Sequence, residues 1–175
     1  MSRSLYIPDA KQNTTYDCGV VCVQLVLAYY GIEKTEPQIR KSLKTNKKWG
    51  TEIRQIKRFL KQKNFKLFAG SLTDNQIKQF IRRKIPIIIL FQAWAPDGTN
   101  YRHCTQWGHY AIISGYNSRG WIIEDPWIFG KGIISYRQMK KQWHADDDNG
   151  KLISNFGIAV WGKRPYDYRT LYPIG

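Results

Sequence analysis

The hydrophobic pattern of this chain changes near residue 85, and the change limits which folds the chain can adopt. Before that point, apolar residues recur at the 3.6-residue spacing of helices, most clearly over residues 18–30, where Gly31 ends the segment. After it, the β-branched run 85–94 predicts a buried strand, and further strand-like segments follow. Helices first and an antiparallel meander of strands afterwards predict an α+β architecture.

Local signals place the individual elements. Thr35 with Gln38 and Thr73 with Gln76 each resemble a helix capping box, and Thr51 is predicted to open a helix between them. The predicted helices cover residues 18–30, 35–44, a segment that starts at 51, 73–83 and 136–143. The predicted strands cover residues 65–69, 85–94, 107–116, 121–125 and 156–161. The main predicted loops are the polar segment 95–106 and the acidic segment 145–150.

The length predicts one domain, and the charge raises the question of an anionic partner. The 175 residues include 28 Lys and Arg against 13 Asp and Glu, a formal net charge of +15. We expect a domain over residues 1–162 and a basic, tyrosine-rich tail, 163–175, packed on it. The basic residues are spread along predicted helices, which is typical of a solvated surface. Nucleic-acid binding is therefore kept only as an alternative.

Cysteine content and the lack of targeting signals favour a reducing, cytoplasmic setting. The longest apolar run, 85–91, is interrupted by Pro86 and is too short to cross a bilayer. No apolar stretch typical of a secretory signal follows Arg3. Three cysteines, an odd number at low density, argue against a disulfide scaffold, so a well-placed cysteine is more often chemical than structural.

Cys18 is the strongest candidate for such a role. It stands at the predicted start of the first helix, where the helix dipole and free backbone N–H groups favour a thiolate and can stabilise an oxyanion. Gly19 would let a substrate backbone approach closely. Gln12, six residues upstream, could supply a second oxyanion donor if the intervening loop folds back. The alternative for Cys18 is a small buried residue of the core.

His109 is the candidate base, and Asp125 is the group that would orient it. A thiolate that attacks a carbonyl needs a base that later protonates the leaving amine, and histidine suits this role at neutral pH. His109 heads a predicted strand and Asp125 ends the next one, sixteen positions on with a turn midway near Asn117. An antiparallel hairpin would bring the two side chains together. A structural histidine and a turn-forming aspartate before Pro126 are the alternatives.

The remaining candidates are weaker. Cys22 lies one turn after Cys18 and is interpreted as core, and no second cysteine pair supports a metal site. His103 is a second candidate base in a polar loop, and His144 is expected to be solvated. The tryptophans mostly fall on predicted strands, where large aromatics pack a core. They are Trp94, Trp107, Trp121, Trp127, Trp143 and Trp161. Trp107 and Trp127 flank the catalytic candidates in sequence, and a substrate groove is the alternative for these two.

These motifs together resemble the bacteriocin-processing peptidases, the double-glycine leader peptidases, which are papain-like cysteine peptidases often fused to peptide-exporting ABC transporters. The resemblance covers about residues 12–161. It is carried by Gln12, Asp17-Cys18-Gly19, Tyr29-Tyr30-Gly31, Gly50-Thr51, Gly108-His109-Tyr110 and Asp125-Pro126. No membrane or ATP-binding segment accompanies them in this sequence, so the stand-alone form is the one it resembles. Val20 and Val21 stand where small residues or proline are expected.

The resemblance implies a papain-like fold in which N-terminal helices pack on an antiparallel sheet. It implies that Cys18 is the nucleophile, His109 the general base and acid, Asp125 the orienting group and Gln12 the oxyanion donor. The implied reaction is peptide-bond cleavage through an acyl-thioester, in this family after two small residues, on a peptide or protein substrate and with no cofactor or metal. Related acyl transfer or deamidation, and a non-catalytic peptide- or nucleic-acid-binding module, are the alternatives.

Overall fold

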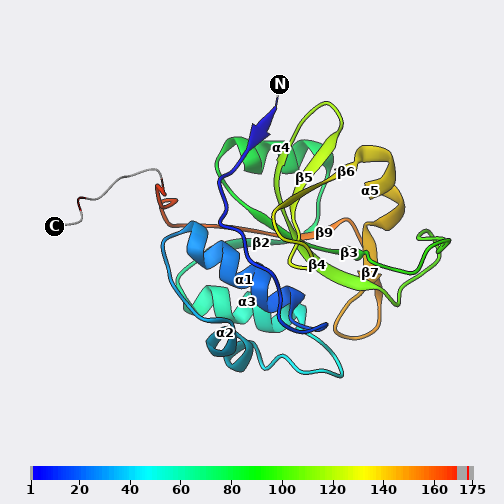
Figure 1. The fold of residues 1–175 in the computed structure, drawn as a ribbon, viewed down its shortest axis with the longest axis horizontal. Coiled ribbons are helices and arrows are strands. Elements are labelled where there is room, and N and C mark those ends of the chain that lie inside the picture. The colour runs from blue at the N-terminus through cyan, green and yellow to red at the C-terminus, as the bar shows by residue number, and fades with distance from the viewer. Residues whose placement is uncertain (1, 169–172, 174–175) are drawn as a thin grey trace.

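The protein is an antiparallel sheet with helices on both faces. The computed structural model describes residues 2–168 and 173. The helices are α1 (Cys18–Tyr29), α2 (Glu36–Leu43), α3 (Ile53–Gln62), α4 (Asp74–Arg82) and α5 (Tyr136–Gln142). The strands are β1 (Arg3–Ser4), β2 (Lys66–Ser71), β3 (Ile87–Gln92), β4 (Gly108–Tyr116), β5 (Gly120–Glu124), β6 (Lys131–Ser135), β7 (His144–Asp146), β8 (Leu152–Ser154) and β9 (Phe156–Trp161). In Figure 1, α1, α2 and α3 lie together on one side of the sheet, and α4 and α5 lie on the other. The predicted α+β fold with N-terminal helices on an antiparallel sheet is confirmed.

The strand order departs from a simple meander. The main sheet runs β2-β9-β3-β4-β5-β6, with β1 paired to the end of β4, and every pair is antiparallel. Strands β3 to β6 follow the predicted meander, but the last strand, β9, returns between β2 and β3. All six residues of β3 are buried, so this strand needs a partner along each edge and a cover on each face. Sequence order alone does not show which later segment supplies the second edge.

Helix α1 is the central helix of the core. The sequence indicated one buried stripe, but ten of its twelve residues are buried. Its uniformly apolar composition fits a helix enclosed by its neighbours, since α1 packs against both β4 and α2. The C-terminal segment closes one end of it. The backbone N–H of Tyr166 donates to Tyr29 O (2.9 Å), and the Tyr168 hydroxyl donates to Ala28 O. The rest of the predicted tail, 169–172 and 174–175, lies outside the described residues.

The acidic loop expected at 145–150 is confirmed for residues 147–150, which form the turn of a hairpin between β7 and β8, while 145 and 146 belong to β7. Asp147 Oδ1 stabilises the turn by accepting from the backbone N–H groups of Asn149 and Lys151 (2.9 Å each). The expected start of the third helix is wrong. The third helix begins at Ile53 and not at Thr51. Its first N–H groups are bonded by a distant carboxylate, that of Asp148, which accepts from Ile53 N (2.7 Å) and Arg54 N (2.8 Å).

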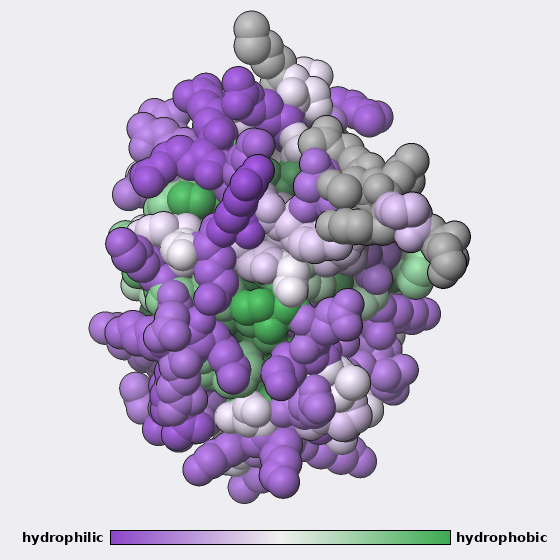
Figure 2. All heavy atoms as spheres, turned by 90° about the vertical axis from the view of Figure 1, so that its left-hand side faces the viewer, coloured by the Kyte–Doolittle hydropathy of each residue, from purple (hydrophilic) through white to green (hydrophobic). Residues whose placement is uncertain are grey.

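The surface is largely hydrophilic on the face shown in Figure 2. Polar residues cover most of that view, around a smaller apolar area. This distribution fits the interpretation that the lysines and arginines of the helices are solvated. Among the described residues, no helix is long and apolar enough to cross a membrane.

Candidate active site

Cys18 is the first residue of α1, and the loop before it is held by a buried ionic network. Asp17 is fully buried and its carboxylate accepts from Thr14 and from Arg40, whose Nε lies 2.9 Å from Oδ1. Arg40 also bonds Glu36 (2.7 Å), which in turn accepts from the Asn13 side chain (2.7 Å). Burial alone would raise the pKa of Asp17, but the bonds from Arg40 and Thr14 and the charge of Arg40 hold it below its usual value.

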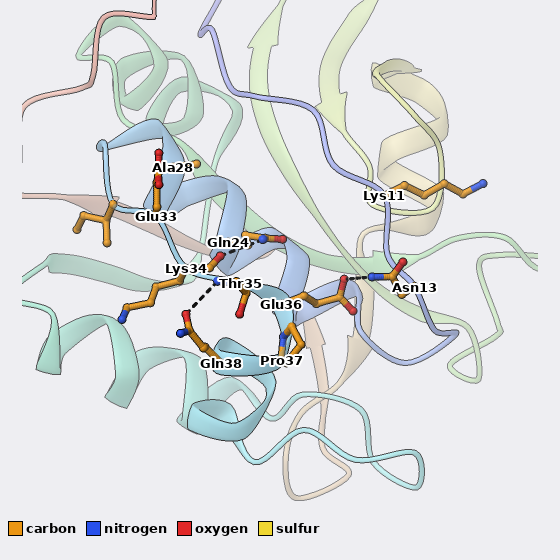
Figure 3. Close-up of a pocket in the computed structure, with 11 residues that line it drawn as sticks. Lys11, Asn13, Gln24, Ala28, Glu33, Lys34, Thr35, Glu36, Pro37 and Gln38 are labelled. Atoms are coloured by element: carbon orange, nitrogen blue, oxygen red, sulfur yellow. Dashed lines mark hydrogen bonds between the residues drawn. The ribbon is translucent and has the colours of Figure 1, made fainter.

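Figure 3 shows the outer side of the ionic network that holds the loop before Cys18. A cavity of about 620 Å³ lies between α1, the start of α2 and the segment before Cys18. Glu36 projects into it and meets Asn13, while Gln24 Nε2 donates to Lys34 O (3.0 Å). The walls of the cavity are thus joined by the bonds that fix the loop at residues 12–17.

Gly19 is required by packing within the protein. A Cβ at this position would lie 2.7 Å from Thr51 Cβ and 3.0 Å from the Tyr110 ring. The expectation that Gly19 opens the site to a substrate backbone is therefore wrong. Its missing side chain makes room for Thr51, whose hydroxyl is bonded to that of Thr45 (2.8 Å). The role of Thr51 in the Gly50-Thr51 pair is thus to pack against Gly19 and not to start a helix.

The hairpin of β4 and β5 brings His109 and Asp125 together. Its register pairs Ile112 with Glu124, so Asp125 lies diagonally across from His109 on the same face. A bulge between Ile113 and Gly115 shifts the pairing nearer the turn. His109 Nε2 and Asp125 Oδ1 are 2.6 Å apart, and both side chains are at least nine-tenths buried. The sequence predicted that a hairpin with its turn near Asn117 would bring His109 and Asp125 side by side, and this prediction is confirmed.

The other side of the His109 ring meets Cys18. Because Nε2 is bonded to Asp125, Nδ1 is the ring nitrogen left to interact with the Cys18 side chain, which acts on the pKa of His109. Burial would lower the pKa of His109. The hydrogen bonds and charges of Asp125 and Cys18 outweigh burial and raise the pKa to about 9. At neutral pH this imidazole therefore holds a proton.

Gln12 lies beside the same turn. Its backbone N–H donates to Pro126 O (2.8 Å), so the loop folds back as an oxyanion role would require. Its side chain is 8% exposed, and Nε2 donates to Thr14 O (2.6 Å). The amide has a second hydrogen on Nε2, and within the described residues Oε1 has no partner.

Trp94 and Trp127 complete the surroundings of Asp125, and no signal in the sequence indicated this for Trp94. The indole N–H of Trp94 donates to Asp125 Oδ2 (3.0 Å), and the backbone N–H of Trp127 donates to Oδ1 (2.9 Å). Their rings lie 6.4 Å apart. Trp94, Trp107 and Trp127 are 47%, 40% and 40% exposed, so the prediction that they pack the core is wrong. Trp121 and Trp143 are buried as predicted.

The other candidate residues lie elsewhere. Cys22 is fully buried, and burial raises the pKa of its thiol well above the usual value. Cys104 contacts Gln92 Oε1 through its sulfur (3.5 Å). His103 is exposed in the loop after β3. His144 was expected to be solvated, but it is half-buried in β7 and its Nε2 bonds Cys104 O (2.8 Å). Within residues 2–168 and 173, no three His, Cys, Asp or Glu side chains gather as a metal site would require.

Comparisons with known proteins agree with this fold. The family model described as the Peptidase C39 family matches residues 7–146. No curated protein sequence matches the chain.

Several solved structures have the same fold. A double glycine motif protease from an AMS/PCAT transporter, in complex with the leader peptide, has a TM-score of 0.66 at 16% identity, covering 90% of this chain and 93% of that one. The peptidase domain of Streptococcus ComA gives 0.63 at 19%, covering 89% and 98%. A C39-like peptidase from Bacillus anthracis gives 0.67 at 14%, covering 95% and 100%.

Proposed function

Because this chain belongs to the Peptidase C39 family, we propose that it is a cysteine peptidase in which Cys18 is the nucleophile, His109 the general base and acid, and Asp125 the group that orients His109. One observation carries the proposal: His109 is bonded to Asp125 through Nε2 (2.6 Å), and Asp125 and Cys18 together raise the pKa of its imidazole. Burial of all three side chains keeps water from weakening these interactions.

The reaction begins from the thiolate of Cys18 and the imidazolium of His109. The sulfur attacks the carbonyl carbon of the scissile peptide bond, and the carbonyl oxygen becomes an oxyanion. When that intermediate collapses, the C–N bond breaks, His109 gives its proton to the leaving amine, and an acyl-thioester remains on Cys18. His109 then takes a proton from water, which hydrolyses the thioester and restores the thiolate and imidazolium.

Two donors are proposed for the oxyanion. The backbone N–H of Cys18 belongs to the first turn of α1, where N–H groups have no partner within the helix. The second donor is the remaining hydrogen of Gln12 Nε2, whose loop is fixed against Pro126. Loss of one such donor typically costs about 10²-fold in kcat.

The proposed substrate is a peptide, cleaved after small residues. The structural relative from an AMS/PCAT transporter holds a leader peptide, and its fold matches over most of both chains. Cleavage after two small residues is the preference that the family resemblance implies for this chain.

Incubation with a peptide library rich in Gly-Gly and Gly-Ala sites, followed by mass spectrometry, tests the proposal. The wild-type protein should cleave a subset of peptides, and Cys18→Ala should cleave none. Cys104→Ser is the matched control, since that cysteine is bonded to Gln92 away from His109, and it should retain activity. Equal cleavage by Cys18→Ala and the wild type would overturn the assignment.

The same samples separate the alternatives. Acyl transfer would give products joined to an added amine, and deamidation would add about 1 Da to intact peptides. Neither product should exceed the hydrolysis products. A protein that binds these peptides but leaves them intact at all pH values from 5 to 10 would be a non-catalytic binding module.

A further inference from the structure

Asp125 has more hydrogen-bond donors than orienting His109 requires. Oδ1 accepts from His109 Nε2 (2.6 Å) and from the backbone N–H of Trp127 (2.9 Å). Oδ2 accepts from the indole N–H of Trp94 (3.0 Å). The first two donors meet one oxygen and leave the carboxylate free to turn about its axis. The third donor meets the other oxygen and fixes the plane of the carboxylate.

The backbone at Trp94 is unusual for a bulky residue. Its φ is +60°, in the left-handed region that side chains other than glycine rarely adopt. The neighbouring residues are tied on both sides, because Ala93 N donates to Trp107 O (3.0 Å) and Ala95 N donates to the Tyr101 hydroxyl (3.2 Å). The fold thus maintains a strained backbone at the residue whose side chain reaches Asp125.

Burial of the indole does not explain why this conformation is kept. Trp94 is 47% exposed, and its ring is tilted by 39° against that of Trp127, which is itself 40% exposed. A residue retained for core packing would be enclosed, as Trp121 is at 1% exposure. What distinguishes Trp94 is the hydrogen bond from its indole to the carboxylate.

We propose that Trp94 is a positioning residue of the active site, which holds the Asp125 carboxylate in the plane that orients His109 toward Cys18. This inference rests on the proposed function, and it adds to the proposed site a residue that acts through Asp125. The indole also covers the Oδ2 side of the carboxylate, so that water does not replace it as the donor.

Trp94→Phe tests the proposal, because it keeps an aromatic ring and removes only the N–H donor and the pyrrole edge. We expect kcat to fall about tenfold with KM changed less than twofold. Trp127→Phe is the matched control. It changes the other ring of the pair, but its bond to Asp125 comes from the backbone and survives. Trp127→Phe should therefore lower kcat less than Trp94→Phe does.

The pH profile separates positioning from a structural role. Without the indole donor the carboxylate turns away from His109. The two titratable groups that act on His109 are Asp125 and Cys18, so weakening the Asp125 bond lowers the pKa of His109 from about 9. The basic limb of the kcat/KM profile should move to lower pH. A purely structural residue would lower the thermal midpoint and leave the profile in place.

A second variant keeps the test decisive if Trp94→Phe does not fold. Tyr101→Phe removes the hydroxyl that accepts from Ala95 N and should shift the profile in the same direction by a smaller amount. Wild-type kcat and an unmoved profile in Trp94→Phe would overturn the proposal. So would equal losses in Trp94→Phe and Trp127→Phe.

Nitrogen NMR of labelled histidine gives a readout that needs no substrate. The His109 titration midpoint should fall in Trp94→Phe and stay unchanged in Trp127→Phe. If the wild type cleaves no peptide, the proposed function fails while this measurement still decides whether Trp94 positions Asp125. An unmoved midpoint alongside normal wild-type cleavage would reject only the role of Trp94.

Discussion

The two sides of the candidate active site each contain a buried carboxylate, and the two are held in different ways. On the helix side, Asp17 precedes Cys18 and is bonded by the guanidinium of Arg40. On the sheet side, Asp125 is bonded by His109 and by the neutral N–H groups of Trp94 and Trp127. The helix side is thus held by a guanidinium, while on the sheet side the carboxylate is bonded by the imidazolium of His109 and two neutral N–H groups.

This difference decides which carboxylate can act on the chemistry. The charge of Asp17 is balanced by Arg40, so Asp17 anchors the loop without opposing a thiolate at Cys18. Asp125 has no lysine or arginine partner among the described residues, and its full charge acts on His109 and raises the pKa of the imidazole. The pattern predicts that variants on the sheet side change catalysis, and variants on the helix side change stability.

The largest effect is expected from His109→Ala. Removing the imidazole removes both the proton carrier and the positive charge beside Cys18, so kcat/KM should fall by about 10³-fold or more. Peptide cleavage measures the loss, and circular dichroism should show an unchanged fold. If His109→Ala retains more than a tenth of the activity, another residue is the base. Substitution of the exposed His103 is the control.

Asp125→Asn should lower kcat by about 10²-fold, because the amide keeps the shape of the carboxylate and loses its charge. The charge is one of the causes that raise the pKa of His109 to about 9, so the pKa falls and the basic limb of the pH–rate profile moves to lower pH. A profile that keeps its position would mean that Asp125 does not act on His109 as described.

Arg40→Met sharpens the comparison from the helix side. It leaves Asp17 buried without its cation and should lower the free energy of unfolding by about 2–3 kcal/mol at pH 7, with a smaller loss of activity in the folded fraction. Chemical denaturation measures it. Arg54→Met is the control, because its pair with Glu52 is exposed and its loss should leave the midpoint unchanged.

The lowered pKa of Asp17 makes the stability loss of Arg40→Met depend on pH. A carboxyl group whose pKa is lower in the folded than in the unfolded chain stabilises the folded state. This stabilisation is complete above the pKa of the unfolded chain, about 3.9, and is lost as the pH falls through the pKa of the folded chain. The difference between wild type and Arg40→Met should therefore be complete at pH 7 and shrink below pH 4. A difference that persists unchanged at pH 2.5 would contradict the ionic explanation.

The smallest effect is expected from Asp148→Ala. It removes the acceptor for the first N–H groups of α3 and should lower the free energy of unfolding by about 1 kcal/mol. Asp146→Ala, on an exposed position of the same hairpin, is the control. Equal changes in the two variants would show that the bonds to Ile53 and Arg54 contribute no net stability.

Local signals in the sequence predicted most of the secondary structure. Both capping boxes, at Thr35 and Thr73, start helices in the structure, because their bonds lie within four residues. What failed depends on contacts far along the chain. The start of α3 is set by Asp148, about 95 residues away, and the place of β9 is set by the two open edges of β2 and β3.

In the candidate site, too, contacts between residues near in sequence could be predicted and contacts between distant residues could not. His109 and Asp125 could be paired from the sequence because a single hairpin joins them, and their separation fixes the register. The contact of Trp94 with Asp125 spans 31 residues and depends on a left-handed backbone at a tryptophan, for which the residue type gives no signal. Gly19 was correctly singled out, but only the structure identifies Thr51 as the neighbour that requires it.

The central place of β9 has a consequence for synthesis of the protein. Until residues 156–161 leave the ribosome, the inner edges of β2 and β3 lack the strand that joins them. A nascent chain that already carries Cys18, His109 and Asp125 therefore exposes an unpaired, isoleucine-rich edge open to intermolecular association. Release of the last strand is the step that makes the sheet continuous, so truncation before residue 156 should yield aggregates and no folded intermediate.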